Sequence, residues 1–144
     1  MKQLCLVLLL FYASFRVVAQ DAITLYQEGL QLKEQKKMKE ASEKFKQAAQ
    51  QKKDYTEALY ELGWCRNDLK DYAGAIQALR QAMPLMRDTY KTNFELGYAF
   101  EKTGSFDSAI YYYNRCLLIN SSNASVHKQL GYVAYQQEDY PKAM

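Results

Sequence analysis

A chain of 144 residues has room for one domain or one short repeat array. Apolar residues make up 49% of it and charged residues 24%, a balance that is typical of a folded protein and argues against disorder. The formal charge of +3 includes Lys2 and Arg16, which lie in a leader segment, so the rest of the chain carries about +1. This charge is too small to predict nucleic acid as a partner.

Residues 1–19 resemble a secretory signal peptide. An apolar run extends from Leu4 to Phe15, and Ala19 stands where cleavage is expected. Arg16 interrupts the run too early for a stable membrane span, which needs about 20 apolar residues. We therefore expect cleavage near Ala19, no stable membrane span after cleavage, and a periplasmic or secreted location in the cell envelope. Retention of the leader as an uncleaved anchor is the alternative.

The chain that follows the leader begins with a lysine-rich stretch. Between Lys33 and Lys53 the lysines are interleaved with Glu34, Glu40 and Glu43 at helical spacing. This pattern predicts a solvated helix face with local ion pairs rather than a binding site for a polyanion.

Four glycines recur every 34 residues, and an alanine follows each of them twelve residues later. Such a fixed period indicates a repeat architecture rather than a single globular core. The glycines are Gly29, Gly63, Gly97 and Gly131, and the alanines are Ala41, Ala75, Ala109 and Ala143. Placing each glycine at position 8 gives units at 22–55, 56–89 and 90–123 and a partial unit at 124–144.

Each complete unit has the pattern of two helices. In the second unit the apolar periodicity predicts helices over 56–69 and 72–83, with a break between them. Gly104 and Ser105 predict the corresponding turn in the third unit, as a helix C-cap followed by an N-cap. Pro84 is expected to end or kink the helix in which it falls.

The periodic glycines need a structural reason, because a glycine inside a helix costs about 1 kcal/mol relative to alanine. Close packing of the two helices of a unit supplies one. We expect Gly63 to face Ala75 and Ala82, which would let the two axes approach closely.

The recurring residues resemble the tetratricopeptide repeat, a helix–turn–helix unit of 34 residues. The resemblance covers residues 22–144 and rests on Leu-Gly at positions 7–8, Ala at 20, Phe45, Leu79 and Tyr113 at 24, and Ala at 27. It implies an all-α fold, namely a right-handed α-solenoid of antiparallel helix pairs with three complete repeats and one truncated repeat. The repeat domain is expected to span residues 20–144.

The fourth unit stops at Met144, which is position 21, and so lacks most of its second helix. Repeat arrays need a polar capping element for solubility. We therefore expect the natural product to be longer than this sequence. Self-association through the uncovered fourth unit is an alternative.

No residue pattern in the chain predicts an enzyme. The single histidine, His127, has no cysteine or serine motif near it and is expected to pack at the seam between repeats. Cys65 and Cys116 occupy positions where other units carry small residues, which predicts packed free thiols rather than a disulfide or a metal site. We expect no catalytic residue, no metal and no cofactor.

The resemblance implies a concave groove lined by the first helix of each unit, at positions 2, 5, 9, 12 and 13. Aromatic side chains dominate these positions, and Trp and Tyr offer large, rigid contact area that suits peptide recognition. The alternative is that these aromatic residues pack between adjacent repeats. The groove positions also hold Leu30, Lys33 and Lys128, and the ten residues predicted to form the binding site are Tyr26, Tyr60, Trp64, Asn67, Lys91, Phe94, Tyr98, Glu101, Tyr132 and Tyr135.

We therefore expect an exported protein-interaction module that binds a peptide or protein segment as a scaffold or assembly factor in the cell envelope. The groove aromatics would anchor apolar side chains, while Lys91 and Glu101 would orient the ligand. Tyr26 and Leu30 stand where family members that bind chaperone C-termini carry Lys and Asn, which disfavours a cytosolic chaperone adaptor. The alternative is the docking or sensory arm of a longer enzyme or signalling receptor.

Overall fold

The structure, a computed structural model, describes residues 21–86 and 89–139. Every regular element within these ranges is a helix. Helical residues 21–34 are followed by α2 (Met38–Gln51), α3 (Thr56–Asp68), α4 (Tyr72–Ala82), the short 3-10 helix η1 (Met83–Leu85), α5 (Tyr90–Lys102), α6 (Phe106–Ile119) and α7 (Ala124–Asp139). The expected all-α fold is confirmed, and the two helices predicted in the second unit each end one residue earlier than expected.

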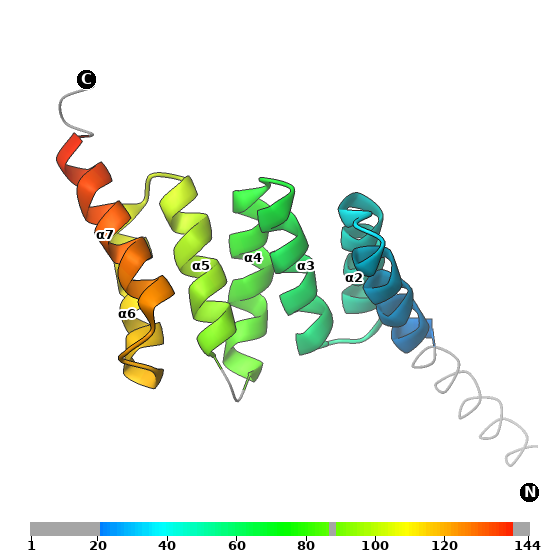
Figure 1. Cartoon of the computed structure of the whole chain (residues 1–144). Helices are drawn as coiled ribbons and strands as arrows, with labels where there is room; N and C mark the ends of the chain where they lie inside the picture. The colour runs from blue at the N-terminus through cyan, green and yellow to red at the C-terminus, as the bar shows by residue number, and fades with distance from the viewer. Residues whose placement is uncertain (1–20, 87–88, 140–144) are drawn as a thin grey trace, which may run out of the picture.

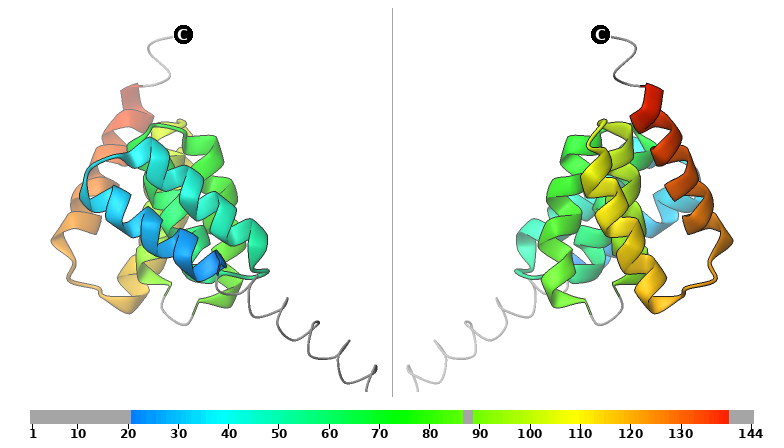
Figure 2. Two further views of the ribbon diagram at one scale, coloured as in Figure 1. Left: turned by 90° about the vertical axis from the view of Figure 1, so that its right-hand side faces the viewer. Right: turned by 90° about the vertical axis from the view of Figure 1, so that its left-hand side faces the viewer.

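The helices form a solenoid of stacked pairs. Residues 21–34, α3, α5 and α7 are the first helices of the four units, and α2, α4 and α6 are the second helices of the first three. Each of α3 and α5 packs on the second helix of its own unit and on that of the preceding unit, and α7 packs on α6. Figure 1 shows the pairs side by side, and the perpendicular views of Figure 2 place residues 21–34 and α7 at opposite ends of the array.

The turn inside each complete unit has the same backbone conformation. The residue at position 15 has a positive φ in every case, which is 60° at Lys36, 63° at Lys70 and 74° at Gly104. In the second unit the Lys70 amide donates to the carbonyl of Asn67 and the Asp71 amide to that of Arg66, a Schellman motif that the other two turns repeat. Only the third turn carries glycine, the residue that favours a positive φ, so residue type alone indicates the left-handed position only there.

Side chains at two helix starts satisfy free backbone amides. Asp71 accepts a hydrogen bond from the Gly74 amide at 3.0 Å and so caps α4, and Asn123 accepts one from the Val126 amide at 3.2 Å at the start of α7. Ser105 occupies the predicted N-cap of α6, but its hydroxyl makes no capping bond there. Pro84 lies in η1, immediately after α4 ends, as predicted.

Each of the first three periodic glycines lies beneath a large side chain of its own second helix. The distances from an added Cβ to the nearest side-chain carbon are 2.7 Å for Gly29 to Phe45, 2.5 Å for Gly63 to Leu79, and 2.7 Å for Gly97 to Tyr113. The covering residue is therefore the one at position 24, sixteen residues after the glycine, and not the alanines that we expected. Ala75 and Ala82 are buried on either side of Leu79 in sequence.

The lysine-rich first unit carries ion pairs, as predicted. The Lys44 ammonium lies 2.6 Å from the Glu28 carboxylate, and the Lys46 ammonium lies 3.8 Å from that of Glu43. Both pairs are partly or largely exposed, so each contributes little to stability.

Cys65 and Cys116 are fully buried free thiols, which confirms that they are packed. Burial disfavours the thiolate and raises the pKa of Cys65 to about 12 and that of Cys116 to about 11. Both side chains therefore behave as small apolar core residues.

The two ends of the chain include predicted features that the structure does not describe. The signal peptide, residues 1–19, and the start of the fourth unit's second helix, residues 140–144, lie outside the described residues. On α7, Val126 and Val133 are buried against the third unit, whereas an added Cβ at Gly131 would meet nothing within 4 Å.

Candidate functional site

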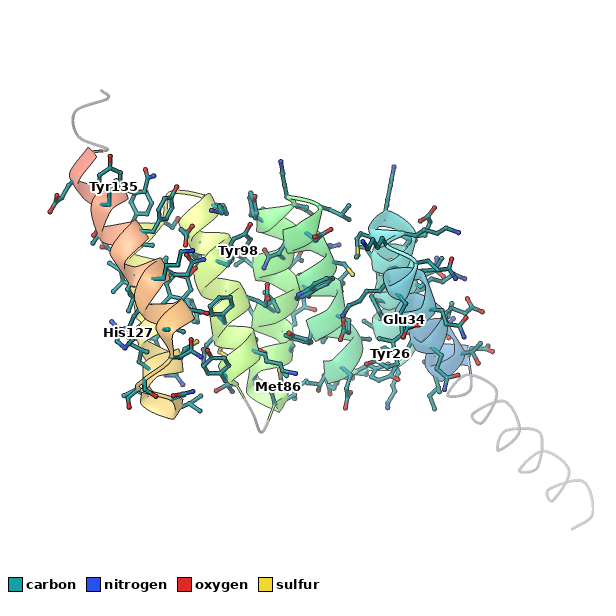
Figure 3. The ribbon with its side chains drawn as sticks, in the orientation of Figure 1. Tyr26, Glu34, Met86, Tyr98, His127 and Tyr135 are labelled. Carbon is teal, nitrogen blue, oxygen red and sulfur yellow. The ribbon has the colours of Figure 1, made fainter. Side chains whose placement is uncertain are left out.

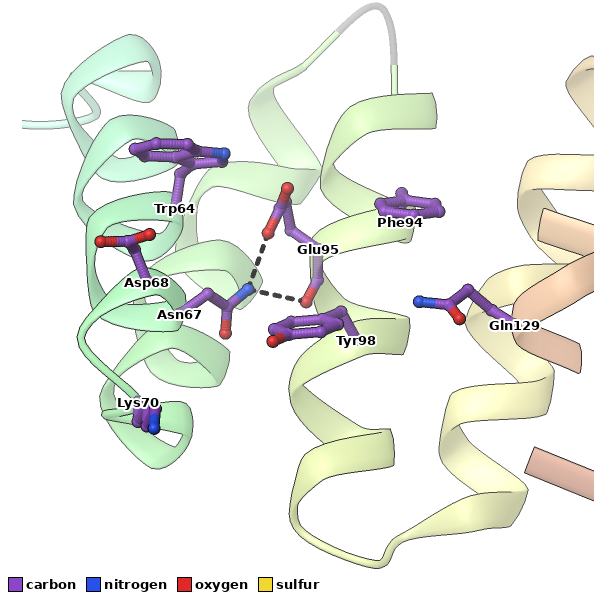
Figure 4. A pocket seen from close by; sticks show the side chains of 8 residues that line it. All are labelled: Trp64, Asn67, Asp68, Lys70, Phe94, Glu95, Tyr98 and Gln129. Atoms are coloured by element: carbon purple, nitrogen blue, oxygen red, sulfur yellow. Dashed lines mark hydrogen bonds between the residues drawn. The ribbon is translucent and has the colours of Figure 1, made fainter. Parts of the chain in front are cut away.

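A pocket of about 330 Å³ opens between α3, α5 and α7, and we call it the central pocket. The side chains come from one face of three successive first helices, because positions 9 and 12 of α3 and positions 5, 6 and 9 of α5 point the same way. Figure 4 shows the rings of Trp64, Phe94 and Tyr98 around this space. The lining residues are Trp64, Asn67, Asp68, Lys70, Phe94, Glu95, Tyr98 and Gln129.

A second pocket, of about 230 Å³, shares Phe94 and Glu95 with the central pocket and continues toward the start of α5. It is lined by Tyr60, Tyr90, Lys91, Phe94, Glu95, Asn123 and Ser125. We call the two pockets together the groove.

Polar side chains cross the seam between successive first helices at one fixed register. Position 12 of one unit meets position 6 of the next, 28 residues further along the chain. Between the first and second units the Lys33 ammonium lies 2.6 Å from the Glu61 carboxylate. Between the second and third, the Asn67 amide nitrogen donates to the carboxylate of Glu95 at 2.8 Å and to its backbone carbonyl at 3.0 Å.

Glu95 is the partly buried carboxylate at the junction of the two pockets. Burial raises its pKa above the ordinary value of 4.5, and the nearby charge of Glu61 acts in the same direction. The hydrogen bond from Asn67 and the charge of Lys33 oppose that shift. The raised pKa means that the carboxylate is poorly solvated.

Asn67 carries a second acceptor, its side-chain oxygen, on the other side of the amide that bonds to Glu95 (Figure 4). The residue is only 4% exposed, and its side-chain oxygen is buried without a hydrogen-bond partner. Figure 4 shows this oxygen on the side of the amide that faces away from Glu95. An unpaired buried acceptor costs free energy, and its partial negative charge adds to that of the Glu95 carboxylate.

The aromatic side chains around these acceptors are held in place by other groups. The Lys33 ammonium stands 4.2 Å from the centre of the Trp64 ring, and the rings of Tyr72 and Tyr98 meet edge to face at 6.1 Å. Burial raises the pKa of Tyr60 and also that of Tyr98. These phenols therefore stay neutral in the groove at physiological pH.

The structure brings together six of the ten residues predicted for the site. Four of them, Trp64, Asn67, Phe94 and Tyr98, line the central pocket, and Tyr60 and Lys91 line the pocket beside it. The remaining four predicted residues lie elsewhere, for different reasons.

Tyr26 belongs to the core of the first unit. Its ring packs 5.6 Å from that of Phe45 and 5.3 Å from that of Tyr55, measured between centroids. These contacts lie within one unit and not between adjacent repeats, and Tyr26 lines neither pocket of the groove.

Glu101 turns into its own unit instead of orienting a ligand. Only 2% of its side chain is exposed, and one carboxylate oxygen accepts a hydrogen bond from the Tyr113 hydroxyl at 2.9 Å. The other oxygen lies 2.8 Å from the Lys102 ammonium. Glu101 therefore fixes the ring that covers Gly97.

Tyr132 and Tyr135 lie on α7 and are 44% and 62% exposed. Tyr132 lines a separate pocket with Lys102 and Phe106, and its hydroxyl accepts a hydrogen bond from Gln136. Figure 3 shows Tyr26 and Tyr135 near opposite ends of the array with Tyr98 between them. The predicted aromatic stripe is thus spread over several places rather than gathered in one site.

The prediction that His127 packs at a seam is wrong. The residue is exposed on α7, and its Nε2 lies 2.9 Å from the carbonyl oxygen of Ser121. Within the described residues no group of three or more His, Cys, Asp or Glu side chains is arranged to hold a metal ion. In the same part of the chain no helix is long and apolar enough to cross a membrane.

Sequence reasoning missed Glu95, the residue that belongs to both pockets. It stands at position 6, which is not among the groove positions that the family resemblance implies. The signal was present in the spacing, because Glu61 follows Lys33 and Glu95 follows Asn67 by the same 28 residues. Pairing polar residues at that spacing would have found both carboxylates.

The stacked helix pairs and the groove on their first helices define an α-solenoid repeat protein. Residues 32–91 match one family model described as tetratricopeptide repeat, and residues 90–123 match a second model with the same description. The chain therefore contains tetratricopeptide repeats. No curated protein matches the chain significantly.

Solved structures share the fold at low sequence identity. The first TPR of Spaghetti (RPAP3), bound to the HSP90 peptide SRMEEVD, is 20% identical with a TM-score of 0.76, over 83% of this chain and 95% of that one. The second TPR domain of human RPAP3, in complex with the HSP70 peptide SGPTIEEVD, is 17% identical with a TM-score of 0.74, over 81% and 98%. MamA from Desulfovibrio magneticus RS-1 is 20% identical with a TM-score of 0.78, over 85% and 70%.

Proposed function

We propose that this protein is a protein-interaction module whose groove binds an extended segment of a partner. The observation that carries the proposal is the convergence of Trp64, Phe94 and Tyr98 on one pocket from two helices. Partly exposed aromatic side chains in a preformed hollow supply contact area at low entropic cost, which is the usual composition of a binding hot spot.

The two RPAP3 domains support a peptide as the ligand, because each was solved with a peptide bound. Their peptides both end in the acidic sequence EEVD. The central pocket of the present chain contains the carboxylates of Asp68 and Glu95, which disfavour an acidic terminus. We therefore propose a peptide ligand of different chemistry.

The direct test replaces Trp64 and Tyr98 by alanine in one variant. Twelve-residue peptides selected on the wild-type protein from a random displayed library should lose at least about tenfold in affinity, because two central anchors are removed. Circular dichroism should stay helical. The control is Tyr111→Ala, since Tyr111 is 55% exposed on α6 and lies outside both pockets. Selected peptides that bind the double variant as tightly as wild type would remove the groove from the proposal.

We also propose that the protein is exported and acts as a scaffold in the cell envelope. The support is the leader, with its apolar run from Leu4 to Phe15 and Ala19 at the cleavage position. Residues 1–40 fused to a phosphatase that folds only outside the bacterial cytoplasm should give an active enzyme with an N-terminus near Gln20. Activity that persists after deletion of residues 2–19, or none with the leader intact, would count against export.

A further inference from the structure

The central pocket combines aromatic faces with more anionic than cationic groups. Glu95 contributes a poorly solvated carboxylate, and Asn67 contributes a buried amide oxygen that has no partner. The charged lining residues are two carboxylates, from Asp68 and Glu95, and one ammonium, from Lys70. Asp68 and Lys70 are both exposed, so water screens their charges better than that of the partly buried Glu95.

The cation whose charge lowers the pKa of Glu95, the Lys33 ammonium, is already engaged. Lys33 makes its 2.6 Å ion pair with Glu61, and the same ammonium covers the Trp64 ring at 4.2 Å. It lowers the pKa of Glu95 only as a more distant charge, behind the effect of the Asn67 hydrogen bond. Among the described residues the Glu95 carboxylate thus accepts the Asn67 hydrogen bond but makes no ion pair, so it can still bind a cationic group of a ligand.

We propose that the central pocket receives an arginine side chain of the bound partner segment. The guanidinium would donate to the Glu95 carboxylate and lie against the flat faces of Tyr98, Trp64 or Phe94. Arginine fits better than lysine, because its planar fork donates in a fixed plane, stacks on aromatic rings and loses less hydration on entry. This inference rests on the proposed function, and it names the residue that specifies the ligand.

The test uses two matched probes, N-acetyl-arginine methylamide and its citrulline analogue, which has the same shape without the charge. Trp64 is the only tryptophan of the chain, so its indole N–H is a single resolved NMR reporter, and the Asn67 side-chain amide is a second. Both signals should shift on titration with the arginine probe. The citrulline probe should bind at least about tenfold more weakly, because it has no positive charge to pair with the Glu95 carboxylate.

Glu95→Gln is the deciding variant, since a glutamine oxygen still accepts the Asn67 hydrogen bond and the fold is retained. It should remove the preference for arginine over citrulline. Glu43→Gln, which removes the same charge from an exposed site on α2, should keep that preference. Equal binding of the two probes to wild type, or an unchanged preference in Glu95→Gln, would overturn the inference.

The failure of this inference can be told from the failure of the proposed function. Library-selected peptides that contain no arginine and still require Trp64 and Tyr98 would refute the arginine pocket and leave the binding groove intact. Selected peptides that bind without Trp64 and Tyr98 would refute the groove itself.

Discussion

The side-chain amide nitrogen of Asn67 donates two hydrogen bonds to Glu95, one to its carboxylate at 2.8 Å and one to its backbone carbonyl at 3.0 Å. This double contact ties α3 to α5 at the floor of the groove. It also places a carboxylate where burial raises its pKa. The same residue that shapes the site therefore makes the stability of the fold depend on pH.

Stability should fall as the Glu95 carboxylate ionises. A carboxyl group whose pKa is higher in the folded than in the unfolded protein contributes stability below its unfolded pKa, and this contribution is lost as pH rises through the folded pKa. The Glu95→Gln variant has no ionisable side chain at this position. The free energy of unfolding of the variant, relative to wild type, should rise from about pH 4 to neutral pH in urea titrations. A relative gain by the wild type over that range would contradict the assignment, and Glu43→Gln is the matched control.

The glycines under the position-24 side chains should not tolerate a methyl group. At Gly97 the added Cβ would stand 2.7 Å from the Tyr113 ring, so Gly97→Ala should destabilise by about 1–3 kcal/mol despite its better helix propensity. At Gly131 nothing lies within 4 Å of the added Cβ, and Gly131→Ala should stabilise by about 0.5–1 kcal/mol. Chemical denaturation measures both. A Gly97→Ala variant that is as stable as Gly131→Ala would show that packing does not require the glycine.

The turn residue Lys36 should be improved by glycine. Its φ of 60° is unfavourable for a side chain, and the exposed residue occupies the position that Gly104 holds in the third unit. Lys36→Gly should raise the free energy of unfolding by about 0.5–1 kcal/mol, and Gly104→Ala should lower it by a similar amount. A loss of stability in Lys36→Gly would indicate that the lysine side chain makes contacts that outweigh its backbone cost.

The Tyr113 hydroxyl should matter for stability because its acceptor is almost fully buried. Tyr113→Phe leaves the Glu101 oxygen without this 2.9 Å hydrogen bond and should cost about 1–3 kcal/mol. Tyr111→Phe removes the same atom from a ring that is 55% exposed and should change stability by less than about 0.5 kcal/mol. Thermal or urea unfolding of the two variants compares them directly. Equal effects of the two variants would show that the hydrogen bond between Tyr113 and Glu101 does not stabilise the folded protein.

The fold could be predicted well from the sequence because the same residue types recur at the same packing positions in three complete units. The helix ends, the turn at Gly104 and the end of α4 before Pro84 follow from local chemistry, and the structure agrees with them to within one residue. The position of Lys36 in a left-handed turn could not be predicted, because lysine gives no local signal for a positive φ. There the surrounding Schellman bonds override the preference of the residue.

The candidate site was harder to predict because side-chain direction is decided by neighbours in other units. Tyr26 and Tyr60 share position 5, yet Tyr26 packs on Phe45 and Tyr55 while Tyr60 lines a pocket. Glu101 shares position 12 with Asn67, but a tyrosine at position 24 draws it inward where the second unit has Leu79. The position of a residue in the repeat therefore predicts the helix face on which it lies. Whether its side chain lines the groove or packs in the core depends on the neighbouring residues of its own unit.

The two kinds of contact along the array have different consequences for the order of its repeats. A glycine and its covering side chain belong to one unit, so a unit that is duplicated or moved carries this contact with it. The polar seam joins two units, because the residue at position 12 of the earlier unit contacts the carboxylate at position 6 of the later one, as Lys33 contacts Glu61 and Asn67 contacts Glu95. A unit that is moved therefore keeps its seam contact only if its new neighbour presents a matching partner.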